Sequence, residues 1–313
     1  MLAFLIRRIA AGAVLVVVVA TATFLMLGLT GTDVARNVLG ETASRAAVAA
    51  KTRQLGLDQP LVERYGHWAG QALQGNLGDS WFTGDPVNQS LMDTLPVTLS
   101  IVFAGLLLAA VLSVALGTAA ALRGGWVDRL VQFAAVLGTA VPSFLIALVL
   151  AVTLAVRLGW LPATGYVALN SSGIDWLRSI ILPAVSLAVG ATAATAMQVR
   201  GAMVDVLRAD FVRTLRSRGL STRSVILRHA LRNAAPPALT VLALQFIGLI
   251  GGAVVVEKVF GLPGIGSLAN SAATRGDAPV LLGTVVVTVV IVVAVNLLLD
   301  IAYGWLNPKV RIS

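Results

Sequence analysis

Residues 7–29 read RRIAAGAVLVVVVATATFLMLGL, two arginines followed by an uninterrupted apolar run. A helix of about 20 apolar residues crosses the hydrocarbon core of a bilayer, so the run Ile9–Leu29 is long enough to span it. A cleaved secretory signal also begins with positive charge, but its apolar stretch is only roughly 7–15 residues long. We therefore expect an uncleaved first membrane span, with a cleaved signal peptide as the alternative.

The rest of the chain has the same apolar character. Of its 313 residues, 58% are hydrophobic and 12% are charged, whereas soluble proteins carry about 25% charged residues. Backbone polar groups in lipid must be bonded within their own segment, so each long apolar run should be a helix. We predict an all-α, polytopic membrane protein with about six spans. They are Ile9–Leu29, Pro96–Leu122, Leu130–Val156, Ile180–Val199, Pro237–Val256 and Val280–Ala302.

The positions of the basic residues predict the orientation in the membrane. With six spans, three groups of arginines fall on one side, at 7–8, at 123–129 and at 200–232, together with Lys309 and Arg311 near the C-terminus. Basic loops stay in the cytoplasm, so both termini should be cytoplasmic. The net charge of +9 then reflects topology and not nucleic-acid binding. Three parts follow: residues 1–30 with the first span, an extracytoplasmic segment at 31–95, and a transmembrane core at 96–313.

The extracytoplasmic segment is too long for a simple loop. Residues Ala43–Leu55 and Pro60–Leu73 have helix-forming composition, and Gly75–Asp79 reads as a turn. We predict a small helical cap on the outer membrane face.

Catalytic and metal-binding motifs are missing from the sequence. It has no cysteine, and its two histidines are far apart and match no zinc-ligand spacing. The phosphate-binding pattern GxxxxGK[ST] is absent, as are HExxH and GxSxG. We therefore expect a non-catalytic chain without a cofactor or metal of its own. If ATP supplies the energy, another polypeptide must bind and hydrolyse it.

The Arg-rich segment at about 204–235 is the most informative part of the predicted cytoplasmic side. Val204, Leu207, Phe211 and Leu215 are spaced to share one helical face. Gly219 can end this helix and Ser221 can begin a second short one that reaches Pro236-Pro237. The segment could be a basic surface for anionic lipid headgroups. Alternatively, it could be a helix–turn–helix that docks into a partner protein.

A family resemblance becomes visible at this segment. Residues Asp210–Leu220 and Arg228–Ala234 resemble the EAA loop of ABC-importer permeases, in the form found in dipeptide and oligopeptide permeases. Similar motifs occur in order along nearly the whole chain. They are LGLDQPL (55–61), GNLGDS (75–80), VPSF (141–144), LPATG (161–165), EKVF (257–260), PGIG (263–266), RGDAP (275–279), NLLLD (296–300) and NPKVR (307–311).

The chain departs from the family pattern at a few positions. Arg213 replaces the acidic first position of the EAA motif and Leu215 replaces its second alanine. Basic replacement of the acidic position is usual in the peptide branch. Thr30–Asp33 replaces a Pro-Gly-Asp-Pro turn, so the first outer turn should have a different shape.

The resemblance implies the type I ABC-importer permease fold and a division of labour between subunits. A homologous second permease would complete the pathway, two P-loop ATPases would hold ATP and Mg, and an extracytoplasmic binding protein would deliver substrate. A cytoplasmic coupling helix would transmit the ATPase motion. We expect the ATPase-docking contact to comprise Phe211, Leu215, Arg216, Gly219 and Leu220.

Residues of the substrate path are harder to identify. Polar groups within spans are costly and often functional, which points to Asn296, although nearby Asp300 could serve a structural pairing with an arginine. Proline breaks are common where helices line a cavity, which points to Pro142. The turn after the fifth span could form an outer gate. The candidates are therefore Pro142, Phe260, Pro263, Gly264 and Asn296.

Other functional classes explain the sequence less well. Ion-coupled secondary transporters, the main alternative, usually have more spans, internal repeats and ionisable relays inside the membrane. An intramembrane enzyme lacks a visible nucleophile–base pair, and a scaffold would not explain the docking-like segment. The sequence thus predicts an importer permease in a bacterial cell membrane, surrounded by lipid. Its substrate class stays open among dipeptides, oligopeptides, glutathione, nickel chelates and haem.

Overall fold

A computed structural model describes residues 2–29 and 33–306. Throughout this part the regular structure is helical, apart from an isolated bridge between Asp79 and Pro86. Five helices are long and apolar enough to cross a membrane, and a bent pair provides a sixth candidate. The prediction of an all-α, polytopic membrane protein is confirmed. The sequence predictions for residues 30–32 and for the motif at 307–311 lie outside the described residues.

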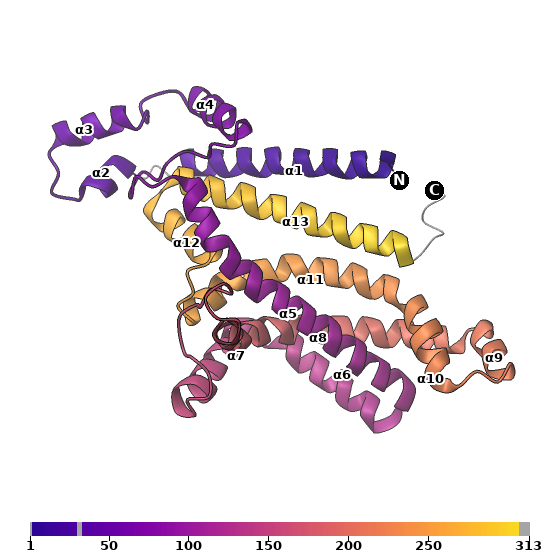
Figure 1. The fold of residues 1–313 in the computed structure, drawn as a ribbon. Coiled ribbons are helices and arrows are strands. Elements are labelled where there is room, and N and C mark those ends of the chain that lie inside the picture. Colours follow the sequence, from indigo (N-terminus) through magenta and orange to yellow (C-terminus); the bar gives the residue numbers. More distant parts are fainter. Residues whose placement is uncertain (1, 30–32, 307–313) are drawn as a thin grey trace. The chain divides into compact units, whose positions relative to one another are not determined.

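Five long helices make the membrane-span candidates (Figure 1). They are α1 (Leu2–Leu29), α5 (Val87–Arg123), α8 (Gly173–Arg208), α11 (Leu231–Val259), which continues from α10 (Thr222–Ser224) and η2 (Val225–Ala230), and α13 (Ala278–Leu306). The shorter helices are α2 (Val34–Leu39), α3 (Arg45–Gln54), α4 (Leu61–Leu73), α6 (Gly125–Ala140), α7 (Ser143–Leu150) with η1 (Ala151–Arg157), α9 (Asp210–Ser217) and α12 (Ile265–Arg275).

The chain forms two compact units. The first contains Met1–Val97 and Pro263–Ala294, and the second contains Thr98–Leu262 and Val295–Ser313. Each unit has its own packed interior and is described by itself below.

The predicted third span, Leu130–Val156, is a bent pair of helices and not the single helix that we expected. α6 ends at Ala140, α7 begins at Ser143, and the two are bent by 96°. Proline has no N–H to donate and disfavours helical backbone in the residue before it, so Val141 is extended (φ −87°, ψ 119°). Pro142 is therefore the cause of the break between two helices.

In the second unit, α5 packs closely on the central helix α8. A Cβ added at Gly117 would lie 2.6 Å from the carbonyl oxygen of Ala196, and one at Gly105 would lie 3.2 Å from that of Ala184. Ala109, between them on the same face, is fully buried. Small residues at this spacing allow two helix backbones to approach closely. Helices in a membrane associate through such packing, because lipid provides no hydrophobic driving force between them.

We expect Gly117→Ala to push α5 away from α8, because the added methyl group would meet backbone. Overpacking of this kind costs about 1–3 kcal/mol of unfolding free energy. Gly248→Ala in α11 is the matched control, since a Cβ there has nothing within 4 Å. Thermal unfolding of the purified protein in detergent measures the difference, and equal midpoints for the two variants would contradict the close approach.

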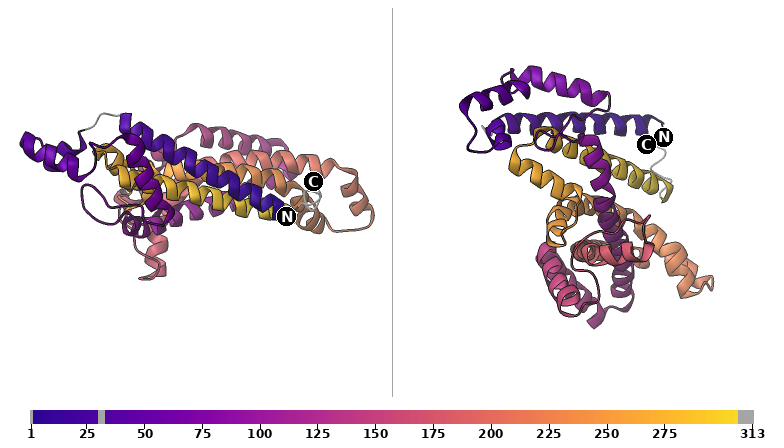
Figure 2. Two further views of the ribbon diagram at one scale, coloured as in Figure 1. Left: turned by 90° about the horizontal axis from the view of Figure 1, so that it is seen from above. Right: turned by 60° about the vertical axis from the view of Figure 1, so that its left-hand side comes forward.

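In the first unit, the cap segment (residues 33–86) uses its helix α4 to pack against α1 (Figure 2). The hydroxyl groups of Tyr65 and Thr21 are 2.5 Å apart, and the Tyr65 ring meets Phe24 edge-to-face at 5.2 Å. The helices expected at 43–55 and 60–73 are present as α3 and α4, and α2 adds a helix that the sequence did not predict. The cap is therefore anchored on the first span.

A buried carboxyl group fixes the end of the cap segment. Asp277, 4% exposed just before α13, accepts hydrogen bonds from the Ser80 hydroxyl (2.5 Å) and the Trp81 N–H (3.2 Å). The Ser80 oxygen in turn accepts from the N–H groups of Phe82 and Thr83, at 3.2 and 3.1 Å. We call this set the Asp277 clasp. It joins two segments 197 residues apart.

Candidate functional site

The connection between α8 and α11 carries the docking residues predicted from the sequence. α8 ends at Arg208, Ala209 is extended (φ −68°, ψ 147°), and α9 then runs beyond the tip of α8 (Figure 1). The extended residue reorients the chain, so the helical face that holds Val204 and Leu207 does not continue into α9. The prediction that Phe211 and Leu215 share that face was wrong.

Val212 is the residue that anchors α9. It is fully buried, as is Val225 in η2, whereas Phe211 is 40% exposed. The sequence prediction treated residues 204–215 as one continuous helix and therefore placed Phe211, and not Val212, on the apolar face. Because the helix is interrupted at Ala209, the buried side of α9 is set by Val212 instead, and the sequence holds no signal for that interruption.

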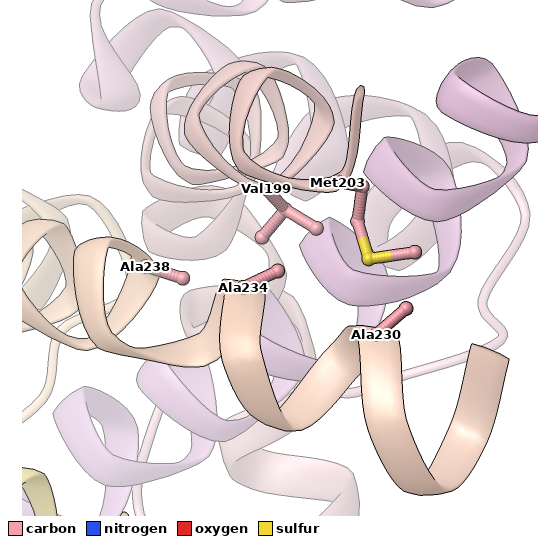
Figure 3. Close-up of a cluster of buried hydrophobic side chains, with 5 residues drawn as sticks. All are labelled: Val199, Met203, Ala230, Ala234 and Ala238. Carbon is pink, nitrogen blue, oxygen red and sulfur yellow. The ribbon is translucent and has the colours of Figure 1, made fainter. Parts of the chain in front are cut away.

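A buried apolar cluster joins α8 to η2 and the start of α11 (Figure 3). It consists of Val199, Met203, Ala230, Ala234 and Ala238. Four of the five members are 2% exposed or less. Since small alanines face Val199 and Met203, the two helices pack closely where they carry α9.

The turn after α9 is a Schellman motif, as the helix-end rules predict for Gly219. The Gly219 N–H donates to the carbonyl of Arg216 (2.9 Å), and the Leu220 N–H donates to that of Leu215 (3.3 Å). Gly219 has φ +79°, a left-handed conformation that residues with a Cβ adopt at a cost. Ser221 then caps the next turn by accepting from the Ser224 N–H at 3.4 Å. The two predicted helix boundaries at Gly219 and Ser221 are confirmed.

The helix that begins after Ser221 does not end at Pro236-Pro237, contrary to the prediction. It continues as one 38-residue helix, Thr222–Val259, with both prolines inside it. Each proline removes one N–H donor and leaves a carbonyl one turn earlier without its helical partner. Arg232 and Asn233, which carry these carbonyls, are exposed, so water can bond to them.

The outward side of α9 combines one aromatic ring with several guanidinium groups. Phe211, Arg213, Arg216 and Arg218 are exposed, while Leu215 and Leu220 are partly buried. The ion pair between Arg213 and Asp210, at 3.6 Å, is highly exposed and contributes little to stability. We call Phe211, Leu215, Arg216, Gly219 and Leu220 the α9 face.

An ion pair links α8, the helix that precedes α9, to α6. The guanidinium group of Arg200 in α8 holds both carboxylate oxygens of Asp128, from Nε to Oδ1 and from Nη2 to Oδ2 (2.5 Å). Such a two-pronged geometry fixes orientation as well as distance. From the sequence Arg200 was only a topology signal, and no pattern indicated its partner 72 residues away.

Phe260, a predicted gate residue, is held in place at the end of α11. It is 2% exposed, and its carbonyl accepts a hydrogen bond from the Gly165 N–H at 3.1 Å. One turn earlier, buried Glu257 accepts from the Thr98 hydroxyl at 2.6 Å. The sequence prediction did not include Glu257 among the site residues.

The other predicted path residues lie in several places. In the first unit, Pro263 is exposed and Gly264 is buried just before α12. In the second unit, Pro142 forms the break between α6 and α7, and Asn296 is partly buried on α13. No hydrogen bond or ring contact joins Pro142, Phe260 and Asn296 in the described part of the chain. Their role in a substrate path stays a prediction.

Comparison with known proteins places this architecture in a family. Residues 113–312 match the model of the binding-protein-dependent transport system inner membrane component, and residues 1–102 match the N-terminal part of such membrane components. The chain belongs to this family. The family's members are multi-pass proteins of the inner membrane, which agrees with the five or six apolar helices.

Relatives extend over the full length of the chain. It is 39% identical over 312 residues to a Brucella abortus protein whose name assigns it to a peptide transport system as a permease, covering 99% of each chain. It is 35% identical over 312 residues to the glutathione transport system permease protein GsiC of Salmonella typhimurium, again covering 99% of each.

A solved structure supports the fold. A chain of the MetNI methionine ABC transporter, in an inward-facing conformation, matches with a TM-score of 0.55 at 18% identity. The match covers 69% of this chain and 96% of that chain. The long helices therefore adopt an ABC-transporter permease fold.

Proposed function

We propose that this chain is the membrane-spanning permease subunit of an ABC importer for dipeptides or oligopeptides. Family membership and full-length relatives named for peptide and glutathione transport support the proposal. The observation that carries it is the α9 face, which presents an exposed Phe211 and an exposed Arg216 on a short helix held by buried Val212 between two long helices.

The α9 face suits docking to an ATPase subunit. Exposed aromatic and arginine side chains are enriched at binding hot spots, and here they project from a helix with a buried anchor, Val212. When ATP draws two ATPase subunits together, a rigid helix seated in each transmits the motion to α8 and α11. The membrane helices then alternate access between the two sides. ATP and Mg are bound by the ATPase subunits and not by this chain.

The proposed assembly has further members. A second permease subunit completes the pathway, and an extracytoplasmic binding protein delivers the substrate to the side that carries the cap segment. Both termini and α9 lie in the cytoplasm, in agreement with the arginines that precede α1 and surround α9. In this arrangement Phe260, Pro263 and Gly264 border the substrate entrance, and Pro142 and Asn296 lie along the path.

Uptake by the reconstituted complex tests the proposed function. We expect proteoliposomes that contain this chain and its co-purified subunits to accumulate a labelled dipeptide only with ATP inside and binding protein outside. Magnesium removal should abolish uptake, because the partner ATPases need it.

An ion-gradient control separates the importer from the alternative class. Proteoliposomes with an imposed proton or sodium gradient but no ATP should accumulate nothing. Uptake driven by such a gradient in the absence of ATPase subunits would overturn the proposal in favour of a secondary transporter.

A further inference from the structure

The cap segment borders an open cavity that the proposed transport cycle does not use. It lies wholly within the first unit, between α4, the Asp277 clasp and the start of α13, and has a volume of about 560 Å³. Sites for small ligands usually measure about 300–1,000 Å³. Aromatic side chains of Phe24, Trp68, Trp81 and Phe82 contribute to its wall.

A half-buried cation, Arg64, borders this cavity and has no counter-ion among the described residues. The guanidinium group of Arg64 lies 5.9 Å from the ring centroid of Phe24, an arrangement that holds it by a cation–π contact. Burial lowers the pKa of Arg64 from its ordinary value. Among the residues that the structure describes, no carboxylate lies within ion-pair distance of Arg64. A partly desolvated guanidinium with open donors is suited to bind an anion.

Charged side chains of both signs line the cavity, which suits a zwitterionic ligand. Lys51 and Arg64 contribute two positive charges and Asp79 one negative charge, which leaves a formal net charge of +1. A short peptide has a carboxylate for the basic side chains and an ammonium group for Asp79, whereas a phosphate has no group for Asp79. Side-chain amides of Gln54, Gln59 and Gln71 also line the wall and can bond to peptide groups.

We propose that this cavity is a binding site for small ligands with a free carboxylate, held by Arg64. For the ligand class, the C-terminal carboxylate of a short peptide, the inference rests on the proposed function. None of the predicted path residues, Pro142, Phe260, Pro263, Gly264 and Asn296, lines this site. It would retain peptide at the cap, independently of the binding protein.

Equilibrium binding to the full-length chain with its co-purified subunits tests the site. The sample is placed in nanodiscs of phosphatidylcholine without binding protein, and calorimetry measures alanyl-alanine, alanyl-alanine amide and inorganic phosphate. We expect the free acid to bind, and the amide and phosphate to bind at least about tenfold more weakly, as loss of a charged hydrogen bond implies.

Two variants assign the binding to the cavity. Arg64→Gln should weaken alanyl-alanine binding by about tenfold or more. Arg53→Gln should leave it unchanged, because Arg53 is an exposed cap residue on α3 that does not line the cavity. Equal binding of acid and amide, tighter binding of phosphate, or an unaltered Arg64→Gln variant would each overturn the proposal.

The outcome separates this inference from the proposed function. If ATP-dependent uptake is present but alanyl-alanine does not bind in the absence of binding protein, only the cap site is wrong. If binding depends on Arg64 but uptake follows an ion gradient, the site stands and the importer assignment fails.

Discussion

Replacing Gly219 with valine should strongly reduce substrate-stimulated ATP hydrolysis by the assembled importer while leaving the chain in the membrane. Gly219 has φ +79°, and β-branched residues are genuine outliers at positive φ. The left-handed conformation costs a residue with a Cβ about 1–2 kcal/mol, which lowers the equilibrium constant for the native turn by about 5–30-fold. Without this turn, Leu220 and Phe211 no longer present one docking face.

The environment of Gly219 makes this a test of coupling and not of folding. A Cβ at Gly219 has nothing within 4 Å, so the side chain of valine begins in open space and the cost lies in the backbone. Gly219→Asn is the matched control, since asparagine tolerates left-handed backbone, and it should keep most of the stimulation. The measurement is ATP hydrolysis with and without substrate-loaded binding protein. Full stimulation in the valine variant would show that the α9 face does not depend on the Schellman turn.

Local rules explain which parts of this structure could be predicted. The length of Ile9–Leu29 indicates a span, and glycine and serine at 219 and 221 indicate a helix end and a helix start. Each of these signals acts over only a few residues. The break at Val141-Pro142 is also local, but apolar composition continues across it, so hydropathy alone merged α6 and α7 into one span.

Contacts between distant segments could not be predicted from one sequence. Val212 is buried only because Ala209 turns the chain, and no residue pattern marks that turn. The Arg200–Asp128 pair and the Asp277 clasp join residues 72 and 197 positions apart. A single sequence shows that Asp277 is polar and near a span. It does not show that its partners are at residues 80 and 81.

The Asp277 clasp leads to the second large effect, a loosened cap segment in Asp277→Asn. The Ser80 oxygen already accepts two backbone N–H groups, so its own hydrogen must be donated to residue 277. The Trp81 N–H also donates to residue 277, and both oxygens of the carboxyl group are therefore acceptors. Asparagine has the same shape but only one oxygen, so in either orientation its NH₂ group faces a donor. One buried donor is left unbonded, which costs about 1–3 kcal/mol.

Hydrogen–deuterium exchange over residues 79–87 measures this loss. We expect exchange there to rise by about tenfold or more in Asp277→Asn, as a loss of at least about 1.4 kcal/mol implies. Asp85→Asn is the control, because that side chain is exposed and the same isosteric change should have no effect. If residues 79–87 exchange at the same rate in the two variants, the Asp277 clasp does not hold the cap segment in place. Because Ser80 and Pro279 also border the cap cavity, the Asp277 variant should in addition weaken carboxylate binding there, although Asp277 does not line it.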